Sequence, residues 1–410
     1  MANVSSSNGL EKRPKLRFPG FDEPYRAVKL GQISSLIKRN DPRSNAPIMM
    51  LSAGNGFIMQ SDKYSRDNAG QSLKKYTLLK KGELAYNHGA SKAKQFGCCY
   101  ELREEEARIP YVYHCFKVQD TEYTPYVALE LNNTKMDKQL KRLVSSSVRM
   151  DGLLNISYDE YMSVVVYLPA YAEQKHIADF LEKLDMRIAK QEQLIESLKK
   201  YKRGVISALL SSKTNPYYSS ETWKEVALCD VASGFEYGMN AAATVYDGSH
   251  KYIRITDIDD NSHLYSQDVP VSPEGQVDEK YRVRENDILF ARTGASVGKS
   301  YRYQRSDGDL YYAGFLIRIH VNSDVNCGYV FQNTLTEAYR RWVLLESARS
   351  GQPGINAEQY KQYRFLLPPL ELQNKISTLA TNLDNLICKE ENLLSQIEQV
   401  KIALLQRLFI

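Results

Sequence analysis

The sequence contains little cysteine and little histidine, and this scarcity argues against several kinds of chemistry. Its 410 residues include six cysteines and six histidines. No two cysteines have CxxC spacing and the histidines form no HExxH constellation, so a zinc site is not expected. The thiols instead look like the reduced, incidental cysteines of a cytosolic protein.

Long apolar runs are also missing from the sequence. No such run approaches 18 residues, so no membrane-spanning helix is expected, and the polar N-terminus lacks the apolar core of a secretory signal. The 54 basic and 49 acidic residues leave a net charge of +5, which permits a nucleic-acid partner without requiring one. These features predict a cytoplasmic protein with a flexible N-terminal segment, residues 1–20, and no membrane partner.

An internal repeat is the dominant feature of the chain. The segment LPAYAEQKHIADFLEKLDMRI, which begins at Leu168, aligns without a gap with LPPLELQNKISTLATNLDNLI, which begins at Leu367. Upstream, the Ile-Ser pair at 156–157 matches the Ile-Asn pair at 355–356, and GELAY followed by GAS resembles NDILF followed by GAS. The repeat predicts two tandem halves, each a domain of roughly 150 residues followed by a long helix.

Each repeated segment carries the pattern of a coiled-coil seam. Mostly apolar residues recur at alternating intervals of four and three along 177–209 and again along 376–408. Lys202 and Lys401 interrupt the two seams at equivalent places. A parallel pair would set these charges face to face at a high cost, whereas an antiparallel pair brings each opposite apolar or end-of-helix neighbours. An antiparallel pair is therefore predicted; the alternative is that each helix packs separately onto its own domain.

The remaining segments have the alternation typical of short strands and a few short helices. Strands are expected at 252–255, 287–291 and 314–321, and short helical stretches within 327–349. The predicted fold class is α+β with a pseudo-two-fold internal repeat. It consists of two globular domains, 21–167 and 212–366, separated by two long antiparallel coiled-coil helices, 168–211 and 367–410.

The stretch ARTGASVGKS at 291–300 raises an ATPase as an alternative. A phosphate-binding loop needs GxxxxGK[ST] between a strand and a helix. Here the spacing from Gly294 to Gly298 is one residue too short, and the following YRYQR alternates like a strand. A glycine-bearing turn that brings cations to phosphates explains the stretch better. No other catalytic constellation is found, so the chain is not expected to be an enzyme.

The two variable domains and their closing segments resemble the specificity (S) subunits of type I restriction–modification enzymes. The resemblance rests on the motif LPxxxxQxxIxxxLxxLDxxI, on the Ile-Ser or Ile-Asn before it, and on the ILFARTGASVGK loop. It extends from Tyr25 to Ile410. The first half departs from the pattern in its loop, which reads NHGASKAK.

This resemblance implies a subunit without catalysis of its own. Each domain is then a target recognition domain that reads one half of a split, asymmetric sequence in double-stranded DNA. Two methyltransferase (M) subunits and restriction (R) subunits are implied as partners, and these would carry S-adenosylmethionine, ATP and magnesium. The alternative function is a coiled-coil scaffold without nucleic-acid binding.

Polar side chains in equivalent loops are the expected DNA contacts, because arginine and asparagine or glutamine read base edges and lysine more often positions phosphates. In the first domain they are Asn87, His88, Ser91, Lys92 and Lys94. In the second they are Arg254, Arg292, Thr293, Ser296, Lys299, Tyr303, Arg349 and Gln352. Gln174 and Gln373, at outward positions of the long helices, are expected to contact M subunits. No residue is expected to bind a metal or a cofactor.

Overall fold

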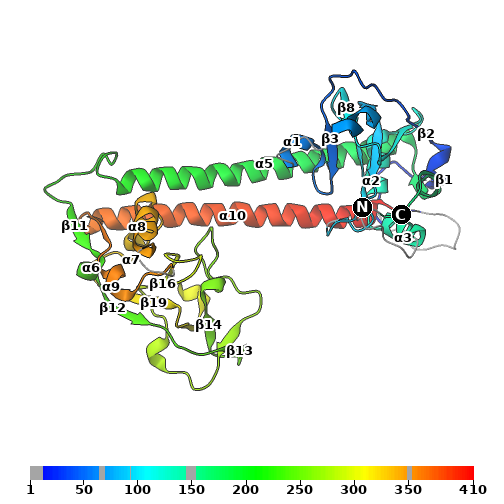
Figure 1. The fold of residues 1–410 in the computed structure, drawn as a ribbon. Helices are drawn as coiled ribbons and strands as arrows, with labels where there is room; N and C mark the ends of the chain where they lie inside the picture. Colours follow the sequence, from blue (N-terminus) through cyan, green and yellow to red (C-terminus); the bar gives the residue numbers. More distant parts are fainter. Residues whose placement is uncertain (1–12, 64–69, 93, 145–153, 349–352) are drawn as a thin grey trace. The chain divides into compact units, whose positions relative to one another are not determined.

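The computed structural model describes residues 13–63, 70–92, 94–144, 154–348 and 353–410 (Figure 1). The chain divides into two compact units, Met1–Glu192 with Leu393–Ile410, and Gln193–Asn392. Each unit contains one α+β domain and a portion of both long helices, α5 (Tyr171–Leu210) and α10 (Leu370–Leu408).

Unit 1 folds around a four-stranded sheet with the order β2-β9-β6-β7. Its strands are β1 (Arg26–Lys29), β2 (Ser34–Leu36), β3 (Met49–Ser52), β4 (Gly56–Met59), β5 (Thr77–Lys80), β6 (Leu84–Asn87), β7 (Cys98–Glu101), β8 (Glu106–Ile109), β9 (His114–Val118) and β10 (Val165–Leu168). Its shorter helices are η1 (Leu30–Gln32), α1 (Gln60–Lys63), η2 (Gly70–Lys75), α2 (Thr124–Leu131), α3 (Met136–Leu143) and α4 (Tyr158–Met162).

Unit 2 repeats this plan with a sheet of order β12-β19-β16-β17. Its strands are β11 (Lys224–Ala227), β12 (Ala232–Tyr237), β13 (Ala243–Val245), β14 (Lys251–Ile253), β15 (Val271–Pro273), β16 (Asp287–Ala291), β17 (Ser300–Arg302), β18 (Leu310–Tyr312), β19 (Leu316–Val321) and β20 (Arg364–Leu367). Its shorter helices are α6 (Leu228–Val231), η3 (Ile255–Asp257), η4 (Glu279–Tyr281), η5 (Arg305–Asp307), α7 (Cys327–Asn333), α8 (Glu337–Ser347) and α9 (Ala357–Lys361).

The two units share a frame but differ in their peripheral strands. In both, the strand that precedes the long helix pairs antiparallel with the first strand of the domain: β10 with β1, and β20 with β11. By contrast, β5 and β8 pair antiparallel, whereas β14 and β18 pair parallel. The common frame and the variable periphery agree with a diverged internal repeat.

The repeated Ile-Ser and Ile-Asn dipeptides start a short helix in each unit. Ser157 and Asn356 are the N-caps of α4 and α9, and each side chain accepts a hydrogen bond from the backbone N–H three residues later. Such caps satisfy amides that the first helical turn leaves without a partner. The preceding residues, Ile156 and Ile355, are both 2% exposed and anchor the helices in the core.

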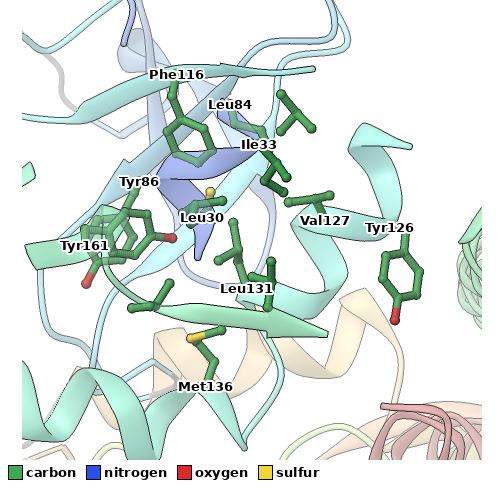
Figure 2. Close-up of a cluster of buried hydrophobic side chains, with 14 of the residues drawn as sticks. Leu30, Ile33, Leu84, Tyr86, Phe116, Tyr126, Val127, Leu131, Met136 and Tyr161 are labelled. Atoms are coloured by element: carbon green, nitrogen blue, oxygen red, sulfur yellow. The ribbon is translucent and has the colours of Figure 1, made fainter. Parts of the chain in front are cut away.

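A stacked aromatic pair ties the central sheet of unit 1 to helix α4. Figure 2 shows Tyr86 of β6 beside Tyr161 of α4, with ring centroids 3.8 Å apart and an interplanar angle of 9°. In unit 2 the equivalent residues, Phe290 and Tyr360, have centroids 4.8 Å apart. These contacts fix the ends of β6 and β16, from which the expected DNA-contacting loops emerge.

The seam of the long helices is buried as the heptad pattern predicts. Ile177 and Leu181 on α5, and Ile376 and Ala380 on α10, are at most 2% exposed. Every other seam position is buried or half-buried. Packing of this apolar stripe stabilises helices of this length, which depend on tertiary contacts more than on intrinsic propensity.

Ion pairs across the seam establish the antiparallel direction within each unit. In unit 1, Lys401 pairs with Asp185, and in unit 2, Lys202 pairs with Asp384 at 2.5 Å. The two pairs are equivalent under the repeat. The antiparallel prediction is confirmed, but its expected neighbours were wrong: each lysine faces an aspartate, because the LD motif of the opposite helix lies at that level.

Candidate nucleic-acid interface

The loop after β6 begins with one half-buried and one buried side chain. The Asn87 side-chain oxygen accepts a hydrogen bond from the Gly89 N–H at 2.9 Å. His88 is 7% exposed, and its ring centroid lies 5.1 Å from that of His114. The structure therefore places His88 in the core of unit 1 and not on the surface that the prediction assumed.

The next part of this loop is a tight turn with one exposed cation. The Ser91 N–H donates to the Lys94 carbonyl at 3.0 Å, and the Lys94 N–H donates to Ser91 Oγ at 3.0 Å. Lys94 Nζ donates to the Asn132 carbonyl at the end of α2, at 2.6 Å, so this ammonium serves its own domain. Lys92 is exposed and is therefore free to approach a phosphate.

The stretch ARTGASVGKS joins β16 to β17, two antiparallel strands. Gly298 has φ +84°, and a Cβ at this position would lie 2.6 Å from the side chain of Val343 in α8. Its N–H donates to the Ala291 carbonyl at 2.9 Å. The glycine is needed for a left-handed turn packed against α8, not for a phosphate cradle at a helix N-terminus.

Two of the expected cations in unit 2 are held by carboxylates. The Arg254 guanidinium forms two hydrogen bonds of 2.8 Å to Asp257, which raises the pKa of Arg254 above its ordinary value. Lys299 forms an ion pair with Asp260, donates to the Ile258 carbonyl at 2.9 Å and has a side chain only 10% exposed. Both groups hold the 254–260 segment in place and are poorly available to DNA.

Arg292 differs from these cations because its charge has no carboxylate partner among the described residues. Its guanidinium lies 4.8 Å from the ring centroid of Tyr237, and its buried Nε has no hydrogen-bond partner. The backbone is held on two sides, since the Arg292 N–H donates to Phe315 and the Ile355 N–H donates to Arg292. A positioned, partly buried guanidinium without an acceptor is suited to bind an acceptor from outside the chain.

Of the other expected contacts in unit 2, Thr293 and Ser296 lie in the same loop, whereas Tyr303 lies at the opposite end of the β16–β17 hairpin, where its N–H donates to the Asp287 carbonyl at 3.2 Å. Thr293 forms a bridge with Gly354, and the Ser296 carbonyl accepts from the Lys299 N–H at 3.0 Å. The Tyr303 hydroxyl donates to the Gly308 carbonyl at 3.0 Å, which turns this group inward. Arg349 and Gln352 lie outside the described residues.

Gln174 was expected at an outward position but is 0% exposed, so that expectation is wrong. Its side-chain oxygen accepts from the Tyr123 N–H at 2.8 Å, and its Nε2 donates to Glu122 at 2.6 Å and to the Pro169 carbonyl at 2.9 Å. The first turn of α5 thus uses this amide to hold the start of α2.

Gln373 is the equivalent of Gln174 in the second repeat. It was also expected at an outward position, and this expectation is wrong because the residue is only 2% exposed. Its oxygen accepts from the Asn326 N–H at 2.9 Å, and its Nε2 donates to the Pro368 carbonyl at 2.7 Å. The conserved spacing within the repeat therefore reflects a structural junction between each domain and its helix.

Two aromatic residues beside Arg292 were not predicted from the sequence as part of the site. Tyr237, at the end of β12, is 42% exposed, and Phe315, in the turn before β19, is 60% exposed. Exposed aromatic rings beside an arginine are typical of nucleic-acid surfaces. The Gly-Phe dipeptide at 314–315 was a signal in the sequence for Phe315. Tyr237 had no such signal, because its contact with Arg292 joins residues 55 positions apart.

The part of the chain that the structure describes also bears on metal binding and membrane insertion. Within it, no group of three histidine, cysteine or acidic side chains is arranged to hold a metal ion. No helix among those residues is long and apolar enough to cross a membrane.

Residues 220–399 match the family described as "Type I restriction modification DNA specificity domain". The specificity subunit of the type I restriction enzyme StySPI from Salmonella potsdam is 24% identical over 272 residues. That alignment covers 62% of this chain and 59% of the relative, so the chain matches less than two thirds of that protein.

Two solved structures share the fold over nearly the whole chain. The crystal structure of a type I restriction–modification S subunit from M. genitalium has a TM-score of 0.60 at 14% identity, covering 97% of this chain and 99% of that one. A structure described as showing complex assembly and conformational transition of the type I R-M system has a TM-score of 0.56 at 14% identity, with coverages of 96% and 99%. At this identity, both matches establish the fold alone.

Proposed function

Because the chain belongs to the family of type I restriction–modification specificity subunits, we propose that it reads a bipartite sequence in double-stranded DNA. Each α+β domain reads one half of the target. The family is not catalytic itself, so the chemistry belongs to partner subunits. The proposal is supported by a repeat that builds two similar frames in one chain.

The difference between equivalent loops is the observation that carries this proposal. His88 follows β6 and is buried, whereas Arg292 follows β16 and lies on Tyr237 without a carboxylate partner among the described residues. One frame therefore presents two different sets of hydrogen-bonding groups. Two unlike readers suit an asymmetric target whose halves differ in sequence.

The long helices are proposed to set the spacing between the two half-sites. A helix of 40 residues, such as α5, extends about 60 Å. One turn of DNA extends about 34 Å, so the helix length is commensurate with separated half-sites. Inserting a heptad into 177–209 should change the spacing and leave both half-sequences intact.

The partners follow from the same proposal. Two M subunits, which would bring S-adenosylmethionine, suit two near-equivalent surfaces of a pseudo-symmetric chain. R subunits would bring ATP and magnesium. These partner subunits would also carry the base methylation and the cleavage.

A domain exchange tests the function directly. Residues 21–167 are replaced by the corresponding domain of another specificity subunit, and the DNA methylated in cells with the M subunit is sequenced. One half of the methylated sequence should change while the other half and the spacing persist. A change in both halves contradicts the modular reading. Exchange of 212–366 is the matched control and should alter the opposite half.

A coiled-coil scaffold without nucleic-acid binding is the alternative function. Two cations in equivalent loops count against it: Lys92 is exposed, and Arg292 has no carboxylate partner among the described residues. Binding to duplex DNA, measured for the chain with its M partner over a range of salt, separates the two. Affinity that falls steeply with salt supports DNA recognition; absence of binding supports the scaffold.

A further inference from the structure

Unit 1 contains a surface cavity. None of the residues expected to contact DNA lines it. The cavity has a volume of about 530 Å³. Its walls come from the end of α2, the segment before α3, α3 itself, strand β10 and the last residue, Ile410. Three of its lining side chains are cationic: Lys135, Lys138 and Arg142.

These cations have no carboxylate partner in the described part of unit 1. By contrast, α8, which follows α7 in unit 2 as α3 follows α2, carries Arg340 and Arg341, and both are within 3.7 Å of Glu337. Lys135 Nζ instead donates to the Phe409 carbonyl at 2.6 Å, a neutral partner. Among the described residues, Lys138 and Arg142 of the cavity therefore keep positive charges that no carboxylate pairs with, unlike the arginines of α8.

The pKa shifts of Lys135 and Glu130 show how charge is distributed in the cavity. Burial lowers the pKa of Lys135, the nearby Glu130 raises it, and the neighbouring Lys15 and Lys138 lower it further. Burial raises the pKa of Glu130 to about 8, so this acidic side chain brings little negative charge at neutral pH. Glu130 and Gln139 are also occupied with the exposed edge of β10, where they accept from the N–H groups of Tyr167 and Val165. Glu130 acts on Lys135, whereas Lys138 and Arg142 form no ion pair with a carboxylate among the described residues.

We propose that this cavity binds a phosphate group through Lys138 and Arg142. A planar guanidinium can hold two phosphate oxygens at once, and an ammonium adds a point charge. Met136 and Val165 provide an apolar wall that accommodates a sugar or base attached to the phosphate. The phosphate comes either from the DNA backbone or from a free phosphate compound. Only the DNA source rests on the proposed function; the site itself does not.

Thermal unfolding of the full chain with inorganic pyrophosphate tests the site. The titration is made at constant ionic strength against chloride, so that general salt effects cancel. At a hundredfold excess over the dissociation constant, Tm should rise by roughly 5–10 °C. The double variant K138Q/R142Q should lose this rise. Because both side chains are exposed, it should fold, and it should be as stable in chloride as the parent or slightly more stable, since repulsion is reduced.

A matched control removes the same charge elsewhere in unit 1. Arg187 and Lys190 are exposed on α5, and R187Q/K190Q should respond to pyrophosphate like the parent. The proposal is overturned if K138Q/R142Q keeps the parental rise, or if both double variants lose it equally, because the response would then reflect net charge.

Binding to duplex DNA distinguishes the two sources. If a DNA phosphate occupies the cavity, the slope of log affinity against log salt should fall by about 1 in K138Q/R142Q and stay unchanged in R187Q/K190Q. A parental slope in K138Q/R142Q, with the pyrophosphate response lost, assigns the site to a free phosphate compound. A chain that binds pyrophosphate but no DNA refutes the proposed function and leaves the phosphate site standing.

Discussion

Lys202 of α5 and Asp384 of α10 form an ion pair of 2.5 Å across the helix seam of unit 2, with side chains 17% and 52% exposed. The pair occupies the place where the seam pattern is interrupted by a charge. Neutralising one partner leaves a half-buried charge without its counter-ion, which is why the pair contributes to the direction of packing.

Removal of either partner should weaken the helix pair modestly. We expect K202M and D384N each to lower the free energy of unfolding and a coupling energy of about 0.5–1 kcal/mol in the double-mutant cycle. Denaturant unfolding at low and high salt measures this, and the coupling should shrink as salt rises. A coupling of zero at low salt contradicts a role for the pair.

Gln373→Leu should destabilise unit 2 without touching any outer surface. The leucine would leave the Asn326 N–H and the Pro368 carbonyl without their buried partner, at a cost of about 1–3 kcal/mol for each group. Gln193→Leu, at an exposed position of the same unit, should change the unfolding free energy by less than about 0.5 kcal/mol. If Gln373→Leu were as stable as the parent but lost M-subunit binding, the original prediction of a partner contact would be restored.

Arg292→Lys should weaken recognition of one half-site. The ammonium keeps the charge but loses the planar fork and the stacking on Tyr237. We expect a loss of about 1–3 kcal/mol for the correct half-site, with the salt slope preserved, measured by DNA binding with the M partner. Arg305→Ala removes an exposed arginine that is paired with Glu285 and should leave half-site preference unchanged. Equal losses on all sequences would show that Arg292 contacts phosphate alone.

Glu130 should make unit 1 less stable as the pH rises. Burial raises the pKa of this carboxyl from 4.5 to about 8, so the folded state binds one proton more than the unfolded state between these values. Stability from this group is therefore present below pH 4.5 and lost as pH rises toward 8, by at most about 1.4 kcal/mol per pH unit. Glu130→Gln should flatten this dependence in denaturant unfolding between pH 5 and pH 8.5. A parallel pH profile for the two proteins would show that Glu130 is ionised in the fold.

Much of the helical framework could be predicted from the sequence. The heptad spacing predicted the seam that Ile177 and Ile376 bury, and the equivalent lysines predicted the antiparallel direction. The seam and the packing direction could be predicted because a helix has a regular period. The spacing of apolar residues and lysines along the sequence therefore shows which of them share a helix face.

The candidate DNA-contacting site could be predicted from the sequence only in part. The loops after β6 and β16 were identified, but the availability of their cations was not. Asp257 holds Arg254, and Asp260 holds Lys299. Arg292 is left with an aromatic ring and no carboxylate partner in the described chain. No periodic pattern distinguishes these three basic side chains.

By itself the sequence determined two related domains, two long helices and the direction in which those helices pack, because repeats and hydrophobic periods are properties of the linear chain. Only the tertiary structure decided which polar groups are buried, as Gln174 and His88 are, and which cations gather around the cavity at α3. The physical reason is that burial and ion pairing depend on neighbours brought together from distant parts of the chain, and their positions are set by packing of the whole unit.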